Sequence, residues 1–536
     1  MAFTAGTMID PLELSVLSHG VAMIAEEMGA VLVRGALSPN IRERRDASSA
    51  IFDARGRMIA QAAHIPVHLG AMPESVAAVR ARNPSPGDVF LLNDPYRGGS
   101  HLPDLTLVEA VDVDGVVGGY TAVRAHHADV GGMSPGSMPQ GATELVQEGL
   151  IVPPIRIVRA GRIDEEILEF VLANVRTPDE RRGDLGAQLA ACASGAAGWQ
   201  ALSARLGATK LGAACDALLD YAERRVRARL GQMEGARGTA RDCLEGDGVT
   251  DDDIEVRVAL QVRDATLHLD FTGSAPQVAG NVNTPSAVTR AAAVFALRTL
   301  LDDDVPTNDG IARAIALVLP ERSVVNAAWP AAVAAGNVEL SQRIADTILA
   351  AFGHAGVDVA AQGQGTMNNV TFGGAGWTFY ETLGGGQGAS SCGKGPSGVH
   401  VGMSNTLNTP VESLERSTPL RIERYALRDG SGGDGEYRGG CGVVRAYRTT
   451  APSTVTLLTE RRRRAPRGVA GGGDGATGRN LLNGNTLPAK CRRTLQPGDV
   501  VTIETPGGGG YGAATVRAET NKSEEKESKS QTTLRQ

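Results

Sequence analysis

Short runs of glycine in the second half of the chain limit its fold more than any other feature. Glycine accounts for 68 of the 536 residues, about 13%, whereas about 7% is usual. The runs have no Gly-X-Y period, which excludes a collagen-like helix. Because glycine lets the backbone turn sharply or approach another backbone closely, we predict glycine loops between short strands. The runs lie at residues 384–388, 430–435, 470–475 and 506–512.

The overall composition is that of a folded protein with large cores. Hydrophobic residues make up 42% and charged residues 21%, and the formal net charge is −7. This negative charge argues against a general nucleic-acid-binding role. The chain has no run of about 18 uncharged apolar residues, so we predict no membrane span. Its N-terminus lacks a basic segment followed by an apolar one, so we expect a cytoplasmic protein.

The six cysteines stand far apart, and none forms a Cys-x-x-Cys pair. This spacing offers neither a zinc knuckle nor a disulfide framework, and it is typical of structural thiols in a reducing compartment. Cys392, in a Gly/Ser loop, has the strongest claim to reactivity among them.

The N-terminal half shows clear secondary-structure signals. Apolar residues recur at three- and four-residue steps from Leu12 to Arg34, which predicts a helix preceded by Asp10 as its N-cap. Residues 48–61 read as two short strands around a turn at Gly56. We further predict a helix over 72–82, strands over 88–92, 105–113 and 116–127, and a mostly helical stretch over 163–232.

From about Asp251 apolar and polar residues alternate, which indicates half-buried strands near 254–260 and 266–271. Helices near 285–302 and 338–353 interrupt this sheet, and strands at 420–427 and 455–460 follow. We therefore predict a multi-domain α+β protein. Its expected parts are an N-terminal α/β region over 1–250, a mixed region over 251–430, a glycine-rich β region over 431–517 and a disordered, lysine-rich tail over 518–536.

Histidine and aspartate gather in two loops of the N-terminal region. His101 and Asp104 stand three residues apart, and His126, His127 and Asp129 follow at the end of a predicted strand. Imidazole together with carboxylate oxygen suits Zn²⁺, Mn²⁺ or Fe²⁺. The alternative is that these histidines cap loops and hydrogen-bond backbone carbonyls. His64 and His68 are weaker candidates for a direct ligand or a substrate contact, and are otherwise packed residues or residues that support a ligand.

One glycine loop imitates a nucleotide site. Residues 388–394 match the start of a phosphate-binding P-loop, but Gly395 stands where a Ser or Thr should coordinate Mg²⁺. No helix is predicted after Lys394 to offer its N-terminus to phosphate. We therefore expect this chain alone to hydrolyse neither ATP nor an amide.

Long ordered segments resemble the B subunits of the hydantoinase/oxoprolinase family. They run from about residue 10 to 515 and so cover nearly the whole chain. The matching segments are Glu43-Arg-Arg-Asp-Ala-Ser-Ser-Ala-Ile-Phe-Asp, Leu92-Asn-Asp-Pro-Tyr-Arg-Gly-Gly-Ser-His-Leu-Pro-Asp, Asp270-Phe-Thr-Gly-Ser, Gly336-Asn-Val-Glu, Tyr380-Glu-Thr-Leu-Gly-Gly-Gly-Gln-Gly-Ala, Asn405-Thr-Leu-Asn-Thr-Pro-Val-Glu, Ser431-Gly-Gly-Asp-Gly-Glu-Tyr-Arg-Gly-Gly and Thr505-Pro-Gly-Gly-Gly-Gly-Tyr-Gly.

The resemblance implies a subunit of an ATP-dependent amidohydrolase that opens a hydantoin, 5-oxoproline or a lactam. It implies an actin-like A subunit that binds ATP, in a heterotetramer or larger complex, and no nucleic acid or membrane partner. It also implies one divalent metal, Zn²⁺ or Mn²⁺, that activates a water. The metal ligands it implies are Asp46, His101, Asp104 and His126.

Two further roles follow as expectations from this chemistry. His127 or Asp129 would move the proton, and the loop with Gly385, Gly386 and Gln387 would bind the substrate and offer N–H groups to the developing oxyanion. Two alternatives remain at this stage. One is a subunit of an ATP-dependent ketone carboxylase acting on acetone or acetophenone, and the other is a non-catalytic structural subunit.

Overall fold

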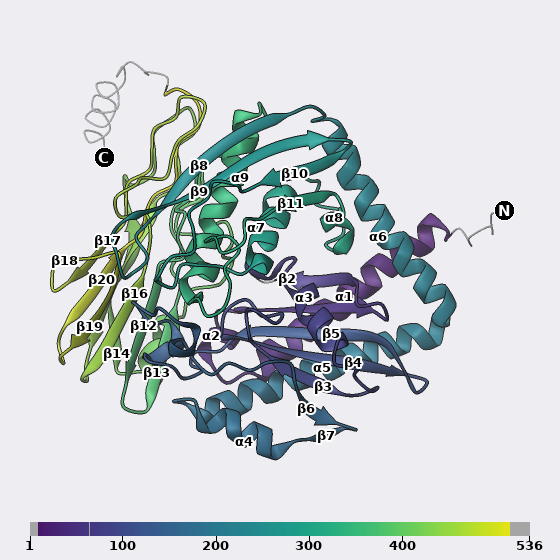
Figure 1. The fold of residues 1–536 in the computed structure, drawn as a ribbon. Coiled ribbons are helices and arrows are strands. Elements are labelled where there is room, and N and C mark those ends of the chain that lie inside the picture. Colours follow the sequence, from purple (N-terminus) through teal and green to yellow (C-terminus); the bar gives the residue numbers. More distant parts are fainter. Residues whose placement is uncertain (1–8, 64, 515–536) are drawn as a thin grey trace, which may run out of the picture.

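Four β-sheets and the helices between them make up the structure. A computed structural model describes residues 9–63 and 65–514. Figure 1 shows the N-terminal strands below, the middle strands above them and the C-terminal strands along one side. The tail predicted over 518–536 and His64 lie outside the described residues.

The N-terminal sheet has seven antiparallel strands in the order β2-β1-β5-β4-β3-β6-β7. The hairpin predicted around Gly56 is confirmed as β1 and β2, and the three strands predicted from 88 to 127 are confirmed as β3, β4 and β5. The bounds are β1 Ala47–Asp53, β2 Met58–Ala63, β3 Val89–Leu92, β4 Asp104–Val113, β5 Val116–His126, β6 Ile155–Arg159 and β7 Arg162–Ile163.

Helices cover this sheet. α1 and α5 pack against each other and against strands β1, β2, β4 and β5. The helix predicted over 12–34 is confirmed as α1, and the helical stretch over 163–232 as α4, α5 and α6. The bounds are α1 Pro11–Gly35, α2 Pro39–Arg42, η1 Pro66–His68, α3 Met72–Arg80, η2 Pro135–Ser137, η3 Leu145–Gln147, α4 Glu165–Ala173, α5 Pro178–Leu206 and α6 Ala208–Gly231.

Helix α1 is relevant to the prediction that the chain has no membrane-spanning helix. By length and composition it is apolar enough to cross a bilayer, although the sequence predicted no such span. Its side chains Leu17, Val21 and Met28 lie in the hydrophobic core that α1 shares with the sheet. The structure therefore uses α1 as a packing helix.

The middle sheet has four strands in the order β11-β10-β9-β8. Helices α7 and α9 pack together, α9 covers β8 and β9, and α7 touches η1 of the N-terminal region. Since β8 pairs with β9, this sheet begins at Arg237, before the expected boundary at 250. The bounds are β8 Arg237–Glu245, β9 Asp253–Arg263, β10 Thr266–Asp270, α7 Ser286–Arg298, α8 Asp309–Ala312, β11 Ile315–Val318, η4 Gly336–Leu340 and α9 Ser341–His354.

Two antiparallel sheets form the C-terminal part, in the orders β13-β12-β16-β19 and β14-β15-β20-β17-β18. They share one core that includes Phe372, Tyr447, Leu457 and Ile503. The bounds are β12 Asn369–Gly374, β13 Trp377–Glu381, α10 Val411–Ser417, β14 Leu420–Arg428, β15 Gly442–Thr449, β16 Ser453–Leu458, β17 Arg479–Leu482, β18 Asn485–Leu487, β19 Lys490–Leu495 and β20 Val500–Glu504.

The glycine runs pack backbone against backbone at one end of these sheets. A Cβ added at Gly508 would lie 2.1 Å from the carbonyl oxygen of Gln387, and one at Gly440 would lie 1.8 Å from that of Pro396. The N–H of Gly440 donates to Gln387 and that of Gly508 to Gly440, both at 2.9 Å. The close approaches predicted from the glycine runs are therefore present, and they join loops of the chain to one another.

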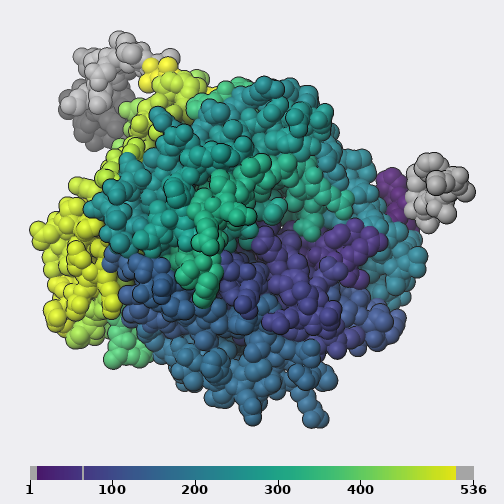
Figure 2. Space-filling model, in the orientation of Figure 1, coloured from purple at the N-terminus to yellow at the C-terminus, as the bar shows by residue number. Residues whose placement is uncertain are grey.

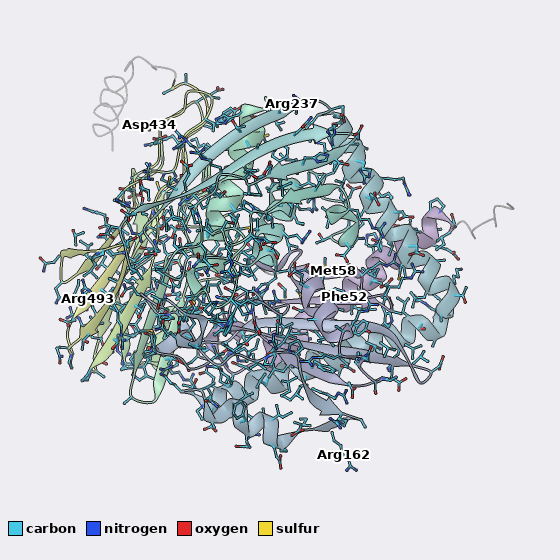
Figure 3. All side chains as sticks on the ribbon, in the orientation of Figure 1. Phe52, Met58, Arg162, Arg237, Asp434 and Arg493 are labelled. Atoms are coloured by element: carbon cyan, nitrogen blue, oxygen red, sulfur yellow. The ribbon has the colours of Figure 1, made fainter. Side chains whose placement is uncertain are left out.

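Burial follows the sheets. Phe52 and Met58, on the β1–β2 hairpin, are buried at the centre of the molecule, whereas Arg162 and Arg493 point outward at its rim (Figure 3). In Figure 2 the C-terminal residues form one continuous band along the edge, beside the middle and N-terminal regions. Polar side chains are buried in these regions as well. A buried polar group is costly unless it has a hydrogen-bond or ion-pair partner.

Candidate metal centre

The two histidine–aspartate loops meet because β4 and β5 are neighbours. Asp104 begins β4, His126 ends β5, and the two residues stand opposite each other in the antiparallel register. His101 lies in the loop that enters β4. The short spacing from His101 to Asp104 and the pairing of the strands thus bring three side chains to one edge of the sheet. We call His101, Asp104 and His126 the histidine–aspartate cluster.

The ligand atoms of the histidine–aspartate cluster converge on one another. Within the described residues these atoms all lie within 4.8 Å of one another. Nε2 of His101 lies 3.1 Å from Oδ1 of Asp104, and Nδ1 of His126 lies 3.4 Å from the same oxygen. All three side chains are at most 3% exposed. This group is therefore able to hold a metal ion.

The other nitrogen of His101 fixes which ring atom carries the hydrogen. Nδ1 lies 3.3 Å from the carbonyl oxygen of Ala334, and a carbonyl can only accept, so Nδ1 is the donor. In the neutral ring, Nε2 then carries the lone pair and faces a carboxylate oxygen, and Nε2 forms no hydrogen bond with any described residue. Nε2 of His101 and Oδ1 of Asp104 would then be two acceptors that face each other. Two ligands of one cation have this arrangement.

Asp104 is held through its second oxygen. Oδ2 accepts a hydrogen bond from Ser100 Oγ at 2.7 Å, and His68 Nε2 lies 3.3 Å away from it. His68 thus contacts Asp104, which agrees with its predicted role as a residue that supports a ligand. With Oδ2 engaged in this way, Oδ1 is left to face the two histidines.

The protonation states of the cluster suit a cation. Burial lowers the pKa of His126 to about 4, so its ring is neutral at pH 7. Burial acts to raise the pKa of Asp104, but the neighbouring His101 and His68 outweigh it and hold that pKa well below its usual value. Neutral imidazole and ionised carboxylate are the forms that bind a divalent metal.

Asp46, the fourth ligand implied by the resemblance, is buried next to the cluster but is not among its converging atoms. Its backbone carbonyl accepts a hydrogen bond from the N–H of His126 at 3.0 Å. Its Oδ2 lies 4.0 Å from Nη1 of Arg44. Burial raises the pKa of Asp46 to about 7, while Arg44 acts in the opposite direction. Its role as a ligand stays a prediction.

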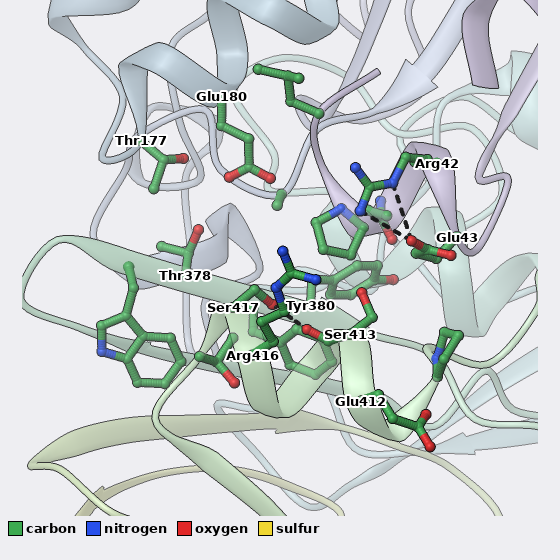
Figure 4. Close-up of a pocket in the computed structure, with 18 of the residues that line it drawn as sticks. Arg42, Glu43, Thr177, Glu180, Thr378, Tyr380, Glu412, Ser413, Arg416 and Ser417 are labelled. Carbon is green, nitrogen blue, oxygen red and sulfur yellow. Dashed lines mark hydrogen bonds and ion pairs between the residues drawn. The ribbon is translucent and has the colours of Figure 1, made fainter. Parts of the chain in front are cut away.

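Tyr380 connects the cluster to a cavity. Its ring stacks on His126 with 4.4 Å between ring centroids, and its hydroxyl donates to Asn369 Oδ1 at 2.8 Å. The same side chain lines a cavity of about 800 Å³ whose walls also carry Arg42, Glu180 and Arg416 (Figure 4). Tyr380 is therefore shared between the cluster and this cavity.

The two predicted proton carriers make contacts of their own. His127 Nε2 lies 2.8 Å from Oε1 of Gln188 on α5. Asp129 accepts hydrogen bonds from the N–H groups of Gly131 and Gly136 and pairs with Arg176 at 2.9 Å. Neither residue belongs to the histidine–aspartate cluster, and their part in proton transfer stays a prediction.

The predicted substrate loop also has its backbone donors engaged. The N–H groups of Gly385, Gly386 and Gln387 donate to the carbonyls of Val399, Pro506 and Pro396 at 2.8 to 3.0 Å. These three donors are therefore not open to a developing oxyanion in this conformation. Substrate binding by this loop stays a prediction.

Comparison with known proteins places the chain in a family. A sequence model described as hydantoinase B/oxoprolinase matches residues 10–514. The chain belongs to this family. Among curated members, a 5-oxoprolinase of Dictyostelium discoideum is 36% identical over 95% of this chain, which spans 41% of that protein. The B-type subunit of a putative D-/L-hydantoinase from a Pseudomonas strain is 30% identical over 94% of this chain and 90% of its own length.

Two solved structures agree with the architecture. An ATP-dependent caprolactamase from Pseudomonas jessenii superposes with a TM-score of 0.87 at 27% identity, covering 95% of this chain and 92% of that one. An acetone carboxylase superposes with a TM-score of 0.83 at 18% identity, covering 94% and 76%. The second likeness shows the shared fold alone.

Several residues around the centre of this family member escaped the sequence analysis. Ser100, Asn337 and Tyr380 all touch the cluster, yet none belongs to a histidine–carboxylate pattern. Each lies in a segment on which the family resemblance rested. For Asn337 and Tyr380 the usable signal was a shared segment that contained no predicted metal ligand, whereas Ser100 lies in the segment that carries His101 and Asp104.

Proposed function

We propose that this chain is the B-type subunit of an ATP-dependent amidohydrolase that opens a cyclic amide such as a hydantoin, 5-oxoproline or a lactam. The observation that carries the proposal is the buried histidine–aspartate cluster, whose converging ligand atoms include Nε2 of His101, which has no hydrogen-bond partner among the described residues. The similarity to oxoprolinases and to the caprolactamase supports a cyclic amide as substrate.

The residues of the cluster fit a divalent metal, Zn²⁺ or Mn²⁺. His101, Asp104 and His126 would hold it, and the adjacent Asp46 would complete the set. Bound there, such a cation would polarise a carbonyl oxygen and lower the pKa of a water. The chain itself positions the ligands, since Ser100 and Ala334 fix Asp104 and His101. Burial of the cluster also limits competing bulk water.

An unactivated amide resists attack because resonance stabilises it, and ATP overcomes this by phosphorylating the amide oxygen. In this chain the loop that imitates a P-loop is engaged elsewhere. The N–H of Ala389 donates to Gly509 and that of Gly395 to Arg438, and the next helix begins only at Val411. These contacts fit an ATP site outside this loop, and we propose that it lies on a separate actin-like A subunit, in a heterotetramer or larger complex.

The cavity that Tyr380 lines is part of the proposal. Its volume of about 800 Å³ lies within the usual range of small-molecule sites, about 300–1,000 Å³. Tyr380, whose ring stacks on His126, is one of the residues that line it. We therefore assign the approach of the cyclic amide to this side of the cluster.

The test is an activity assay of the chain purified together with an A-type subunit. We expect ATP-dependent ring opening of at least one of hydantoin, 5-oxoproline or caprolactam, and no turnover by either subunit alone. Acetone and acetophenone with bicarbonate are the comparison substrates. Carboxylation of a ketone without ring opening would replace the hydrolase assignment, and absence of every reaction in a metal-loaded complex would favour a structural role.

A further inference from the structure

A short π-helix presents an asparagine to the histidine–aspartate cluster. η4 spans Gly336–Leu340 and leads directly into α9. A Cβ at Gly336 would lie 1.8 Å from the carbonyl oxygen of Asn283, and the N–H groups of Ala335 and Gly336 both donate to Asn281 at 3.0 Å. The segment is therefore tightly held where it meets the cluster. π-Helical turns occur frequently at functional sites.

The amide nitrogen of Asn337 has a hydrogen-bond partner, whereas its amide oxygen has none among the described residues. It is 2% exposed. Its Nδ2 lies 3.5 Å from Oδ2 of Asp104, at the outer limit of a hydrogen bond. Chemistry fixes this orientation, because a carboxylate oxygen attracts the amide NH₂ and repels the amide oxygen. Oδ1 then points away from Asp104 and has no hydrogen-bond partner among the described residues.

An unpaired buried amide oxygen is costly. Leaving such an acceptor unsatisfied costs about 1–3 kcal/mol, and most buried polar atoms in native proteins are paired. The Oδ1 of Asn337 therefore needs a donor that the described residues do not supply. A cyclic amide carries such a donor, the ring N–H, directly beside the carbonyl carbon that must be attacked.

We infer that Oδ1 of Asn337 accepts a hydrogen bond from the ring N–H of the substrate and so selects unsubstituted cyclic amides. This inference rests on the proposed function. With its N–H on Asn337, the ring presents its adjacent carbonyl toward the histidine–aspartate cluster. Asn337 is thus a recognition residue that sets the orientation of the ring and discriminates against N-alkylated rings.

The test compares each ring with its N-methyl derivative. Binding of hydantoin, 5-oxoproline and caprolactam, and of the derivatives methylated at the nitrogen of the ring amide bond that opens, is measured by ligand-observed NMR on the metal-loaded chain. We expect the wild type to bind at least one N–H ring about 10-fold or more tightly than its N-methyl form. Asn337→Leu should reduce that ratio to near one with its metal content unchanged. Asn337→Ser, which shortens the side chain, serves if the leucine variant fails to fold.

Asn281→Leu is the matched control. Asn281 is equally buried, and its Oδ1 is also unpaired among the described residues, but its Nδ2 donates to Pro139 and not to the cluster. Its substitution should leave the ratio unchanged. The inference is overturned if the wild type binds no N–H ring or does not discriminate, or if the Asn337 variants keep the ratio or lose metal. Failure of the proposed function is separate, since it appears as absent ring opening by the A/B complex.

Discussion

Two buried polar clusters lie in this molecule, and they differ in how their charges are balanced. In the histidine–aspartate cluster, Asp104 pairs only with histidines among the described residues, and with no arginine or lysine. The other cluster, which we call the arginine–carboxylate network, joins Arg343, Arg461 and Lys490 to Asp242, Asp346 and Glu460. Within it Arg461 lies 2.9 Å from both Asp242 and Asp346, and Arg343 lies 3.1 Å from Asp242.

The difference separates a structural role from a functional one. In the arginine–carboxylate network the chain supplies its own cations, and the pairs join helix α9 and strand β8 to residues that follow β16. Breaking such a network leaves a buried charge without a partner. In the histidine–aspartate cluster the proposed cation is a metal ion, which would come from outside the chain. The predictions below separate metal binding from folding on this basis.

The largest effect is expected for the ligands themselves. His101→Ala and His126→Ala should reduce bound metal from about one equivalent to none and abolish ring opening by the A/B complex, because each substitution removes a converging nitrogen. Elemental analysis of the purified variants measures this. His127→Gln is the control, since His127 contacts Gln188 instead, and it should retain the metal. Equal metal content in all four proteins, wild type included, would refute the ligand assignment.

A large loss of stability without loss of metal is expected in the arginine–carboxylate network. Arg343→Leu leaves Asp242 and Glu460 with fewer buried partners, which should cost about 3–5 kcal/mol of unfolding free energy. Denaturant unfolding and metal analysis measure the two quantities. Arg182→Leu removes exposed ion pairs on α5 and should change stability by less than about 1 kcal/mol. Similar effects for the two variants would remove the distinction between the clusters.

A smaller effect is expected for the support of Asp104. Ser100→Ala removes the 2.7 Å hydrogen bond to Oδ2 and should weaken metal binding by about 10- to 100-fold, the usual cost of losing a residue that orients a metal ligand. Competition with a chelator measures the affinity. Ser49→Ala also removes a buried hydroxyl, but one that donates to Ala25, so metal affinity should not change. An unaltered affinity in Ser100→Ala would show that Asp104 needs no such support.

The smallest effect is expected for the hydroxyl of Tyr380. Tyr380→Phe keeps the ring that stacks on His126 and removes the hydrogen bond to Asn369. Unfolding free energy should fall by about 1 kcal/mol, with metal content retained. Thermal unfolding of the metal-loaded chain provides the value. Loss of metal in this variant would mean that Tyr380 contributes more to the centre than a stacked ring.

Much of the centre was predictable because its residues lie close together in sequence. The three-residue spacing of His101 and Asp104, and the strand that ends at His126, already predicted that two loops would meet. Antiparallel pairing of β4 and β5 then made the contact unavoidable. Local patterns of this kind also gave most of the helices and strands of the N-terminal half.

The remaining contacts could not be predicted from local patterns. Asn337 and Tyr380 reach the cluster from more than 200 residues further along the chain, and only the packing of three regions brings them there. The glycine runs were informative about backbone packing, but the sequence did not show that the N–H groups of Gly385 and Gly386 would pair within the chain. Strand β8 was also missed, because all of it lies before the change in pattern at about Asp251.

The most direct test of the account is a crystal structure of the purified protein with anomalous diffraction recorded at the absorption edges of zinc and manganese. We predict one anomalous peak inside the histidine–aspartate cluster, about 2.0–2.2 Å from a nitrogen of His101, a nitrogen of His126 and an oxygen of Asp104. The arginine–carboxylate network should give no peak. A fully ordered cluster without an anomalous peak, in protein grown and purified with both metals present, would contradict the claim that this cluster is completed by a metal.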